Sequence, residues 1–310
     1  MRMNFVRGMV IVSMRKTLLF VVLGLTAFAG AGRATAAGGV LQVVAAENFW
    51  GSIAAQLGGD RVHVTSVIAN PATDPHDYEP TAVDARAFAT AQLAIVNGVG
   101  YDAWAPKLLA ADPAGGRLTL TVGDAVGIEA GGNPHRWYSP PDVQRVIAAI
   151  VADYKRLDPK DAAYFDRQRK SFETMGLAAY KAEIATIRKT YAGTAVGASE
   201  SIFAPLAQAL GLRLVTPASF LKAISEGTEP TAKDVSTIDR QIARRELRVW
   251  VFNSQNSTPD VQRLTDAARS RGIPVTAITE TLTPATATFQ AWQVAQLRAL
   301  RAALAKAARR

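Results

Sequence analysis

The sequence predicts an α/β protein of two doubly wound α/β lobes joined by a long, rigid interlobe helix. In the 310-residue chain, short apolar runs alternate with amphipathic stretches, the pattern of parallel sheets covered by helices. The alternation forms two series, separated by a helical stretch too long for a crossover within one sheet. A single large doubly wound sheet with one long helix is the alternative, because chain length alone does not count domains.

Residues 1–36 are predicted to be a signal peptide. They combine a basic start, an apolar run over 17–30 and the small-residue cleavage pattern Ala34-Thr35-Ala36. The apolar run is shorter than the ~20 residues of a membrane span, which favours cleavage over anchoring. The five positive charges of this segment supply most of the net charge of +9 and leave +4 without them, so we expect no nucleic-acid partner.

The chain contains no cysteine. This excludes a disulfide scaffold, a thiolate metal site and a lipid anchor attached through an N-terminal cysteine. Any metal must therefore be held by nitrogen and oxygen atoms. Together with the signal peptide, this composition predicts a soluble, unlipidated protein of the periplasm.

The first lobe is expected over residues 37–157. Strands are predicted at 41–45, 62–68, 93–96 and 118–122, with helices at 50–57, 83–91 and 102–110. Thr81 and Asp84 have the spacing of a capping box, which begins the second of these helices. A further helix begins at Pro140 and ends before Pro159.

The segment 158–192 is predicted to be the linking helix. Its apolar residues follow helical spacing up to Gly193, a typical C-terminal stop. Such a helix is on the order of 45 Å long, about the length of a whole domain. The second lobe, 193–310, repeats the alternation of the first. Its strands are predicted at 194–198, 213–215, 249–252 and 274–278.

Two of the three histidines lie in loops stiffened by proline. His76 stands in DPHDYEP, after the second predicted strand, and His135 stands in NPHRWYSP, ahead of the interlobe helices. An isolated loop histidine is usually only exposed, but a proline before a ligand reduces the conformational entropy lost when a metal fixes the loop. His63 alternates with apolar residues of a predicted strand, and its simplest interpretation is a strand-face residue.

Two carboxylates follow strands of the second lobe. Glu200 comes after strand 194–198 and Glu280 after strand 274–278, at carboxyl ends where open α/β sheets bind ligands. Either acid taken alone is equally explained as a negative charge favoured at a helix N-terminus. With His76 and His135, they form a set of two imidazoles and two carboxylates. This set suits Zn²⁺ or Mn²⁺, with Fe²⁺ as a further candidate, and does not suit Cu⁺.

The motifs around these residues resemble those of the zinc/manganese solute-binding proteins of ABC importers, over about residues 40–304. DPHDYEP and NPHRWYSP are similar to the two histidine loops of that family, and GASESIF to the segment of its third ligand. ISEGTEPTAKDV is similar to another family signature, and ITETL stands at the place of the fourth ligand. The resemblance implies two lobes bridged by one long helix and a metal held by His76, His135, Glu200 and Glu280. The family usually has aspartate as its fourth ligand, and many zinc-specific members carry a histidine-rich loop that this sequence lacks.

The predicted function is capture of Zn²⁺ or Mn²⁺ as cargo in an interlobe cleft and delivery to an ABC permease in the inner membrane. We expect a monomer that is not an enzyme, because four protein ligands fill a tetrahedral shell and leave no position for a substrate. A metalloenzyme with two histidines and a carboxylate is one alternative, and a binding protein for a non-metal small solute is another. An α/β hydrolase is excluded, because GASES lacks the final glycine of the nucleophile elbow and all three histidines precede Ser199, whereas that fold places its histidine after the serine.

Overall fold

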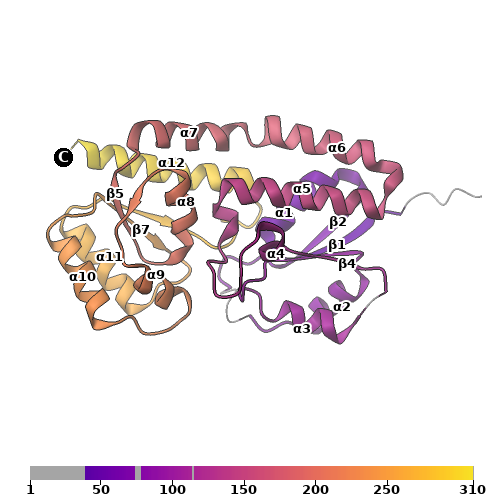
Figure 1. Cartoon of the computed structure of the whole chain (residues 1–310), viewed down its shortest axis with the longest axis horizontal. Helices are drawn as coiled ribbons and strands as arrows, with labels where there is room; N and C mark the ends of the chain where they lie inside the picture. The colour runs from indigo at the N-terminus through magenta and orange to yellow at the C-terminus, as the bar shows by residue number, and fades with distance from the viewer. Residues whose placement is uncertain (1–38, 74–77, 114, 310) are drawn as a thin grey trace, which may run out of the picture. The chain divides into compact units, whose positions relative to one another are not determined.

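Two four-stranded parallel sheets organise the chain in the computed structural model, which describes residues 39–73, 78–113 and 115–309 (Figure 1). The predicted signal peptide and His76 lie outside these residues. The first sheet has the order β2-β1-β3-β4 and consists of β1 (Leu41–Glu47), β2 (Val62–Ile68), β3 (Leu93–Val96) and β4 (Leu118–Thr121). The second has the order β6-β5-β7-β8 and consists of β5 (Ala195–Ala198), β6 (Arg213–Leu214), β7 (Val249–Asn253) and β8 (Val275–Ile278).

All strand pairs in both sheets are parallel, which confirms the predicted class of two parallel-sheet α/β lobes. Each predicted strand is present within two residues of its expected bounds. In each sheet, the second strand along the chain pairs with one side of the first strand, and the third strand pairs with its other side. The direction in which strands are added therefore reverses at the β1–β3 pair and at the β5–β7 pair. Ligands of open α/β sheets bind beyond the carboxyl ends of strands at such reversal points.

Three short helices connect the strands of the first sheet: α1 (Asn48–Gly58), α2 (Ala82–Thr90) and α3 (Ala105–Ala111). A fourth, α4 (Val122–Val126), follows its last strand. The predicted capping box at the start of α2 is confirmed. The Thr81 side chain accepts hydrogen bonds from the backbone N–H of Val83 and Asp84, and the Asp84 carboxylate accepts one from Thr81 N at 2.6 Å. This satisfies backbone donors that the first helical turn leaves without a partner.

The connection between the sheets is a succession of helical segments and not one regular helix. It comprises α5 (Pro140–Leu157), a 3₁₀ turn (Pro159–Asp161), α6 (Ala162–Ser171), a π-helical segment (Phe172–Gly176) and α7 (Ala178–Tyr191). The two ends of the connection pack on different partners. Phe165 of α6 lies 5.2 Å, ring to ring, from Tyr154 of α5, whereas Tyr180 of α7 lies 6.1 Å from Phe289 of the last helix. The π segment has a wider turn and lies between these two contacts. On one side of it the connection packs against α5, and on the other side against the last helix.

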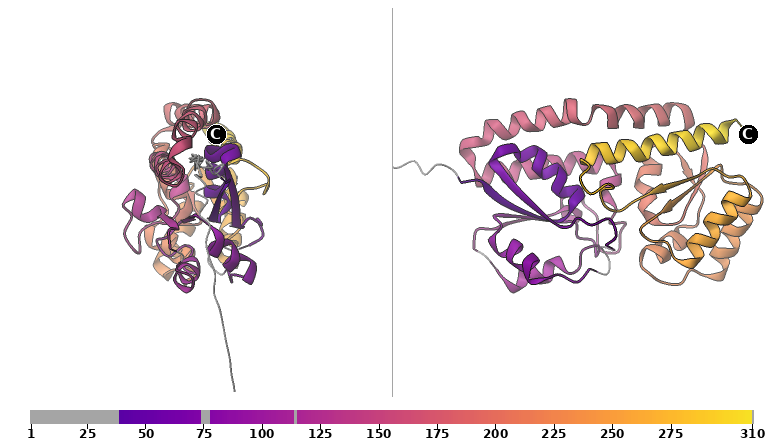
Figure 2. Two further views of the ribbon diagram at one scale, coloured as in Figure 1. Left: turned by 90° about the vertical axis from the view of Figure 1, so that its right-hand side faces the viewer. Right: turned by 180° about the vertical axis from the view of Figure 1, so that it is seen from behind.

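Five helices follow in the second half: α8 (Ala204–Ala209), α9 (Ala218–Ser225), α10 (Ala232–Ala243), α11 (Pro259–Ser270) and α12 (Phe289–Ala308). Helix α12 begins against the first half, where Phe289 N donates to Ser52 Oγ of α1 at 2.9 Å. It then runs beside α7 along the second half (Figure 2). Glu183 of α7 accepts hydrogen bonds from Arg298 and Arg301 of α12. The two halves are thus joined through α1 and α12 as well as through the connecting helices.

One apolar core extends through both halves. It includes Trp50 beside the first sheet, Tyr154 in the connection and Trp250 in the second sheet, none of which is exposed. Residues 38–310 accordingly form one compact unit. The boundaries at 37–157, 158–192 and 193–310 stay a prediction about how that unit is divided. Among the described helices, none combines the length and apolarity needed to cross a bilayer.

Candidate metal centre

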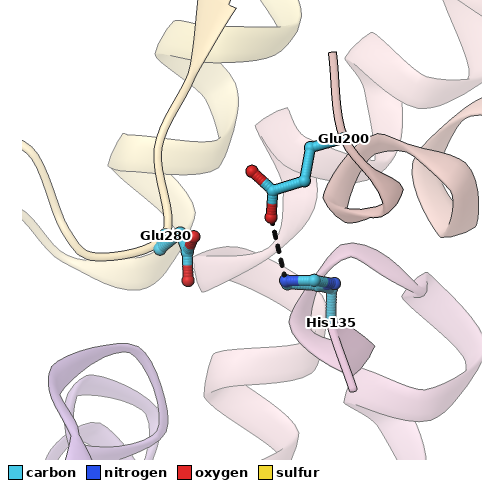
Figure 3. Close-up of side chains that lie close together, drawn as sticks. All are labelled: His135, Glu200 and Glu280. Atoms are coloured by element: carbon cyan, nitrogen blue, oxygen red, sulfur yellow. Dashed lines mark ion pairs between the residues drawn. The ribbon is translucent and has the colours of Figure 1, made fainter. Parts of the chain in front are cut away.

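Three of the predicted ligand residues stand at the ends of secondary-structure elements that converge on one point (Figure 3). Glu200 lies just beyond β5, and Glu280 lies just beyond β8, so both extend from the carboxyl edge of the second sheet. His135 comes from the first half, directly before the short 3₁₀ helix Arg136–Tyr138 that leads into α5. His76, the fourth predicted ligand, lies outside the described residues.

The side chains of His135, Glu200 and Glu280 are brought together at this point. One potential ligand atom from each lies within 4.8 Å of the others. His135 Nε2 and Glu200 Oε1 are 3.6 Å apart, and the exposed fractions of the three residues are 0, 0 and 1%. Two buried carboxylates so close together repel each other, so the arrangement favours a shared cation.

Hydrogen bonds fix the orientation of the His135 ring. Asn133 Oδ1 accepts from His135 N at 3.0 Å and lies 2.9 Å from His135 Nδ1, while Asn133 Nδ2 donates to the carbonyl of Ser201 at 2.7 Å. Because the Asn133 oxygen can only accept, Nδ1 carries the ring hydrogen of a neutral imidazole. The lone pair of Nε2 is then directed at Glu200, which is the arrangement usual for a metal-binding histidine.

The two carboxylates share a polar neighbour, Asn253, at the end of β7. Its Nδ2 donates to Glu200 Oε2 at 2.8 Å and to Glu280 Oε1 at 2.7 Å. Glu280 Oε2 accepts a further hydrogen bond, at 2.6 Å, from the hydroxyl of Tyr101 in the first half. Burial, followed by the charges of Glu280 and Glu47, raises the pKa of Tyr101 well above its ordinary value, so this phenol remains a donor.

Tyr101 is held by a tight loop that follows β3. Gly98, Val99 and Gly100 have φ values of +72°, +56° and +82°. A positive φ is strained for a β-branched residue such as Val99, and such strain persists only where the surroundings enforce it. Asp102 supplies that restraint, because its carboxylate accepts from Asn97 N at 2.6 Å and from Gly98 N at 2.8 Å.

A further buried acid, Glu47, lies at the end of β1. Burial is the main cause that raises the pKa of Glu47 well above its ordinary value, and the neighbouring charge of Asp102 adds to it. Burial also raises the pKa of Asp102, but the two backbone N–H groups that its carboxylate accepts act in the opposite direction. Burial and mutual repulsion thus disfavour two full negative charges on this pair near the site.

The segment that leads toward His76 contacts the Glu280 loop. Gln255 Nε2 donates to the carbonyl of Pro71, and Gln255 Oε1 accepts from the backbone N–H of Glu280 at 2.6 Å and of Thr281 at 3.0 Å. One glutamine side chain therefore connects the first half to the backbone that carries Glu280.

Sequence reasoning missed Asn253, Tyr101 and Asn133. For Asn253 there was a usable signal, because it is the polar residue that ends a predicted apolar strand neighbouring those of Glu200 and Glu280. For Tyr101 and Asn133 there was none, because a loop tyrosine or asparagine is commonplace and its partner lies far away in the sequence.

The fold and the site together define a two-lobed binding protein with a buried set of nitrogen and oxygen donors. Comparison with known families supports this class. The family model described as the periplasmic component A of the zinc-uptake complex matches residues 43–303, so the chain belongs to that family.

Individual relatives are distant. The manganese-binding lipoprotein MntA of Halalkalibacterium halodurans is 28% identical over 40% of this chain, and the alignment spans 42% of that relative, less than half of its length. The metal ABC transporter substrate-binding lipoprotein FimA of Streptococcus parasanguinis is 23% identical over 79% of this chain and 81% of the relative. The manganese-bound periplasmic metal-binding protein of Candidatus Liberibacter asiaticus shares the fold, with a TM-score of 0.69 at 18% identity, covering 84% of this chain and 98% of that one.

Proposed function

We propose that this chain is a periplasmic solute-binding protein that captures one Zn²⁺ or Mn²⁺ ion and delivers it to an ABC importer in the inner membrane. The observation that carries the proposal is the convergence of His135, Glu200 and Glu280, whose ligand atoms lie within 4.8 Å of one another in the protein interior. Membership of the zinc-uptake family and the names of the manganese-binding relatives support it.

The charges of the proposed ligands suit a divalent cation. The neutral imidazole of His135 and the carboxylates of Glu200 and Glu280 together balance two positive charges. Burying an ion requires that protein atoms replace its hydration shell, and these donors supply part of that replacement. We propose His76, from the other proline-stiffened loop, as the fourth ligand.

The same ligand set favours binding over catalysis. Four protein ligands complete a tetrahedral zinc shell, whereas a catalytic zinc keeps one position for water or substrate. We therefore propose that the protein carries the ion as cargo and is not an enzyme. Fe²⁺ is a third candidate cargo, because imidazole and carboxylate also suit this ion.

A titration of the chelator-stripped protein with Zn²⁺ and Mn²⁺, against a competing chromophoric chelator, tests the proposal. We expect one ion per chain. His76→Ala, His135→Ala, Glu200→Ala and Glu280→Ala should each weaken binding by about a hundredfold or more, since even partners of ligands typically account for 10–100-fold. His63→Ala is the matched control, because His63 is exposed on β2 and should bind like the wild type. Unchanged titrations in His135→Ala and Glu200→Ala would overturn the assignment.

We further propose that residues 1–36 direct export, that the mature protein is an unlipidated monomer and that it has no nucleic-acid partner. The basic, apolar and small-residue regions of 1–36 and the lack of cysteine in the sequence support this. Cell fractionation, the intact mass of the mature chain and its mass by light scattering test these points. A mature chain that keeps residues 1–36, or a stable dimer, contradicts them.

A further inference from the structure

Asn253 occupies the central place at the carboxyl edge of the second sheet. Strand β7 lies between β5 and β8, so its last residue stands between the two acids that follow those strands. Asn253 is fully buried, and its backbone N–H donates to Ser199 Oγ at 3.1 Å. The fold thus places one amide side chain between Glu200 and Glu280.

The orientation of the Asn253 amide is fixed by its neighbour. Its Oδ1 accepts a hydrogen bond from the backbone N–H of Gln255 at 3.0 Å, and a backbone N–H can only donate. Nδ2 must therefore face the acids, and its two hydrogens serve Glu200 Oε2 at 2.8 Å and Glu280 Oε1 at 2.7 Å. One oxygen of each carboxylate is occupied in this way. Of the other two oxygens, Glu200 Oε1 lies 3.6 Å from His135 Nε2 and accepts from Ser225 Oγ at 3.3 Å. Glu280 Oε2 accepts from Tyr101.

Zn²⁺ and Mn²⁺ differ in how many oxygens of a carboxylate they bind. Zn²⁺ is satisfied by four ligands in a tetrahedron, to which each carboxylate contributes one oxygen. Mn²⁺ prefers a larger, oxygen-rich shell, which a carboxylate supplies when it binds through both oxygens. To turn both oxygens toward one ion, each carboxylate would have to rotate away from Asn253, which would weaken that hydrogen bond and leave a buried N–H poorly satisfied.

On the basis of the proposed function, we propose that Asn253 is a positioning residue that determines metal preference. By holding one oxygen of Glu200 and one of Glu280, it restricts both acids to single-oxygen binding and favours Zn²⁺ over Mn²⁺. The residue does not contact the ion itself and acts through the two carboxylates.

The test is the ratio of Zn²⁺ to Mn²⁺ affinity in the full mature chain and in Asn253→Ala. We expect this ratio to fall by about tenfold, which corresponds to the loss of one to two hydrogen bonds that oppose the larger shell. Asn256→Ala removes the same side chain three residues further on, where Asn256 Nδ2 donates to the carbonyl of Ile224, and should leave the ratio unchanged. Asn253→Ser, which offers one hydrogen instead of two, should give an intermediate ratio and provides the test if Asn253→Ala does not fold.

Visible absorption of the Co²⁺-loaded proteins gives a second measurement that a purely structural role would not change. The wild type should show the intense bands of four-coordinate cobalt, and Asn253→Ala the weak bands of a higher coordination number. If both affinities fall equally, so that the ratio and the cobalt spectrum are those of the wild type, the role of Asn253 in metal preference is overturned. If the wild type binds neither Zn²⁺ nor Mn²⁺, the proposed function itself fails, which is a separate result.

Discussion

Tyr101 links the two halves of the molecule through one short hydrogen bond. Its hydroxyl donates to Glu280 Oε2 at 2.6 Å, both residues are buried, and the strained loop at Val99 holds the tyrosine in place. A proposed ligand in one half is therefore oriented by a donor from the other half. This side chain orients the carboxylate in the way that partners of metal ligands commonly do.

Tyr101→Phe should lower metal affinity by about tenfold, because Glu280 loses the donor that orients it. Competition titrations with Zn²⁺ measure this effect. Tyr164→Phe is the control, since the Tyr164 hydroxyl accepts from the backbone N–H of Asp60, near the start of β2, and should bind normally. Equal affinities in Tyr101→Phe and the wild type would show that Glu280 is oriented without the phenol.

Glu47→Gln should flatten the pH dependence of stability. Burial keeps Glu47 protonated in the folded protein above its ordinary pKa of 4.5, where the unfolded chain releases that proton. The folded state then binds more protons, so the wild-type free energy of unfolding falls as the pH rises above that value. Glutamine removes this contribution, and the decline as the pH rises above about 5 should be smaller in urea titrations of the metal-free protein. Exposed Glu129→Gln should behave like the wild type, and identical slopes in all three proteins would contradict the protonation of Glu47.

For single residues, the sequence predicted which side chains converge better than it predicted the hydrogen bonds that orient them. His135, Glu200 and Glu280 were predicted from proline loops and strand ends, and they do converge, while their role as ligands stays a prediction. The surrounding hydrogen bonds were not predictable. Tyr101 and Glu280 are separated by 179 residues, and no local pattern marks such a pair.

The connecting helices show where helical periodicity is informative and where it is not. The apolar spacing predicted a helical segment up to Gly193, and the chain is helical as far as Tyr191. The π segment at Phe172–Gly176 was not predicted, and it lies where the packing partner of the connection changes. Helix α6 packs on α5, whereas α7 packs on α12. The spacing of apolar residues along the sequence does not indicate this change of packing partner.

Gly51 lies where α1 packs closely against the first sheet, and Gly51→Ala tests this packing. A methyl group there would meet Ser66 Oγ at 2.1 Å, so the variant should lose roughly 1–3 kcal/mol of stability through overpacking. Adding Ser66→Ala should restore most of the loss, because the remaining contacts at 3.4 Å are ordinary. Gly115→Ala, with open space around it, is the control for thermal unfolding. A double variant no more stable than Gly51→Ala would exclude the Ser66 hydroxyl as the cause.

At the scale of the whole molecule, the halves are connected in more than one place. Besides the connecting helices, α12 begins against α1, where Gln290 and Gln56 exchange hydrogen bonds at 2.7 and 3.2 Å. The two series of strands and the helix between them predicted two lobes. The return of α12 to α1 was not predictable, because it depends on contacts between residues 234 positions apart. With several connections, we expect ion release through small tilting or loop movement rather than a wide hinge motion.

Metal should stabilise the entire chain as a single cooperative unit, because the proposed ligands come from both halves. The gain is ~4 kcal/mol when free metal exceeds Kd a thousandfold. Differential scanning calorimetry should show one transition that moves to higher temperature with Zn²⁺, and no comparable move in His135→Ala. A transition that splits, with only one part responding to metal, would show that the ligands do not couple the halves.

The aromatic surroundings of His135 also have a practical consequence. The Trp137 ring lies 5.1 Å from the imidazole and is stacked on Phe49 at 4.1 Å, shielded from solvent. Indole emission responds to nearby charge, so an ion arriving at His135 should alter the intrinsic fluorescence of this buried tryptophan. Loading and unloading can then be followed in real time with the unlabelled protein.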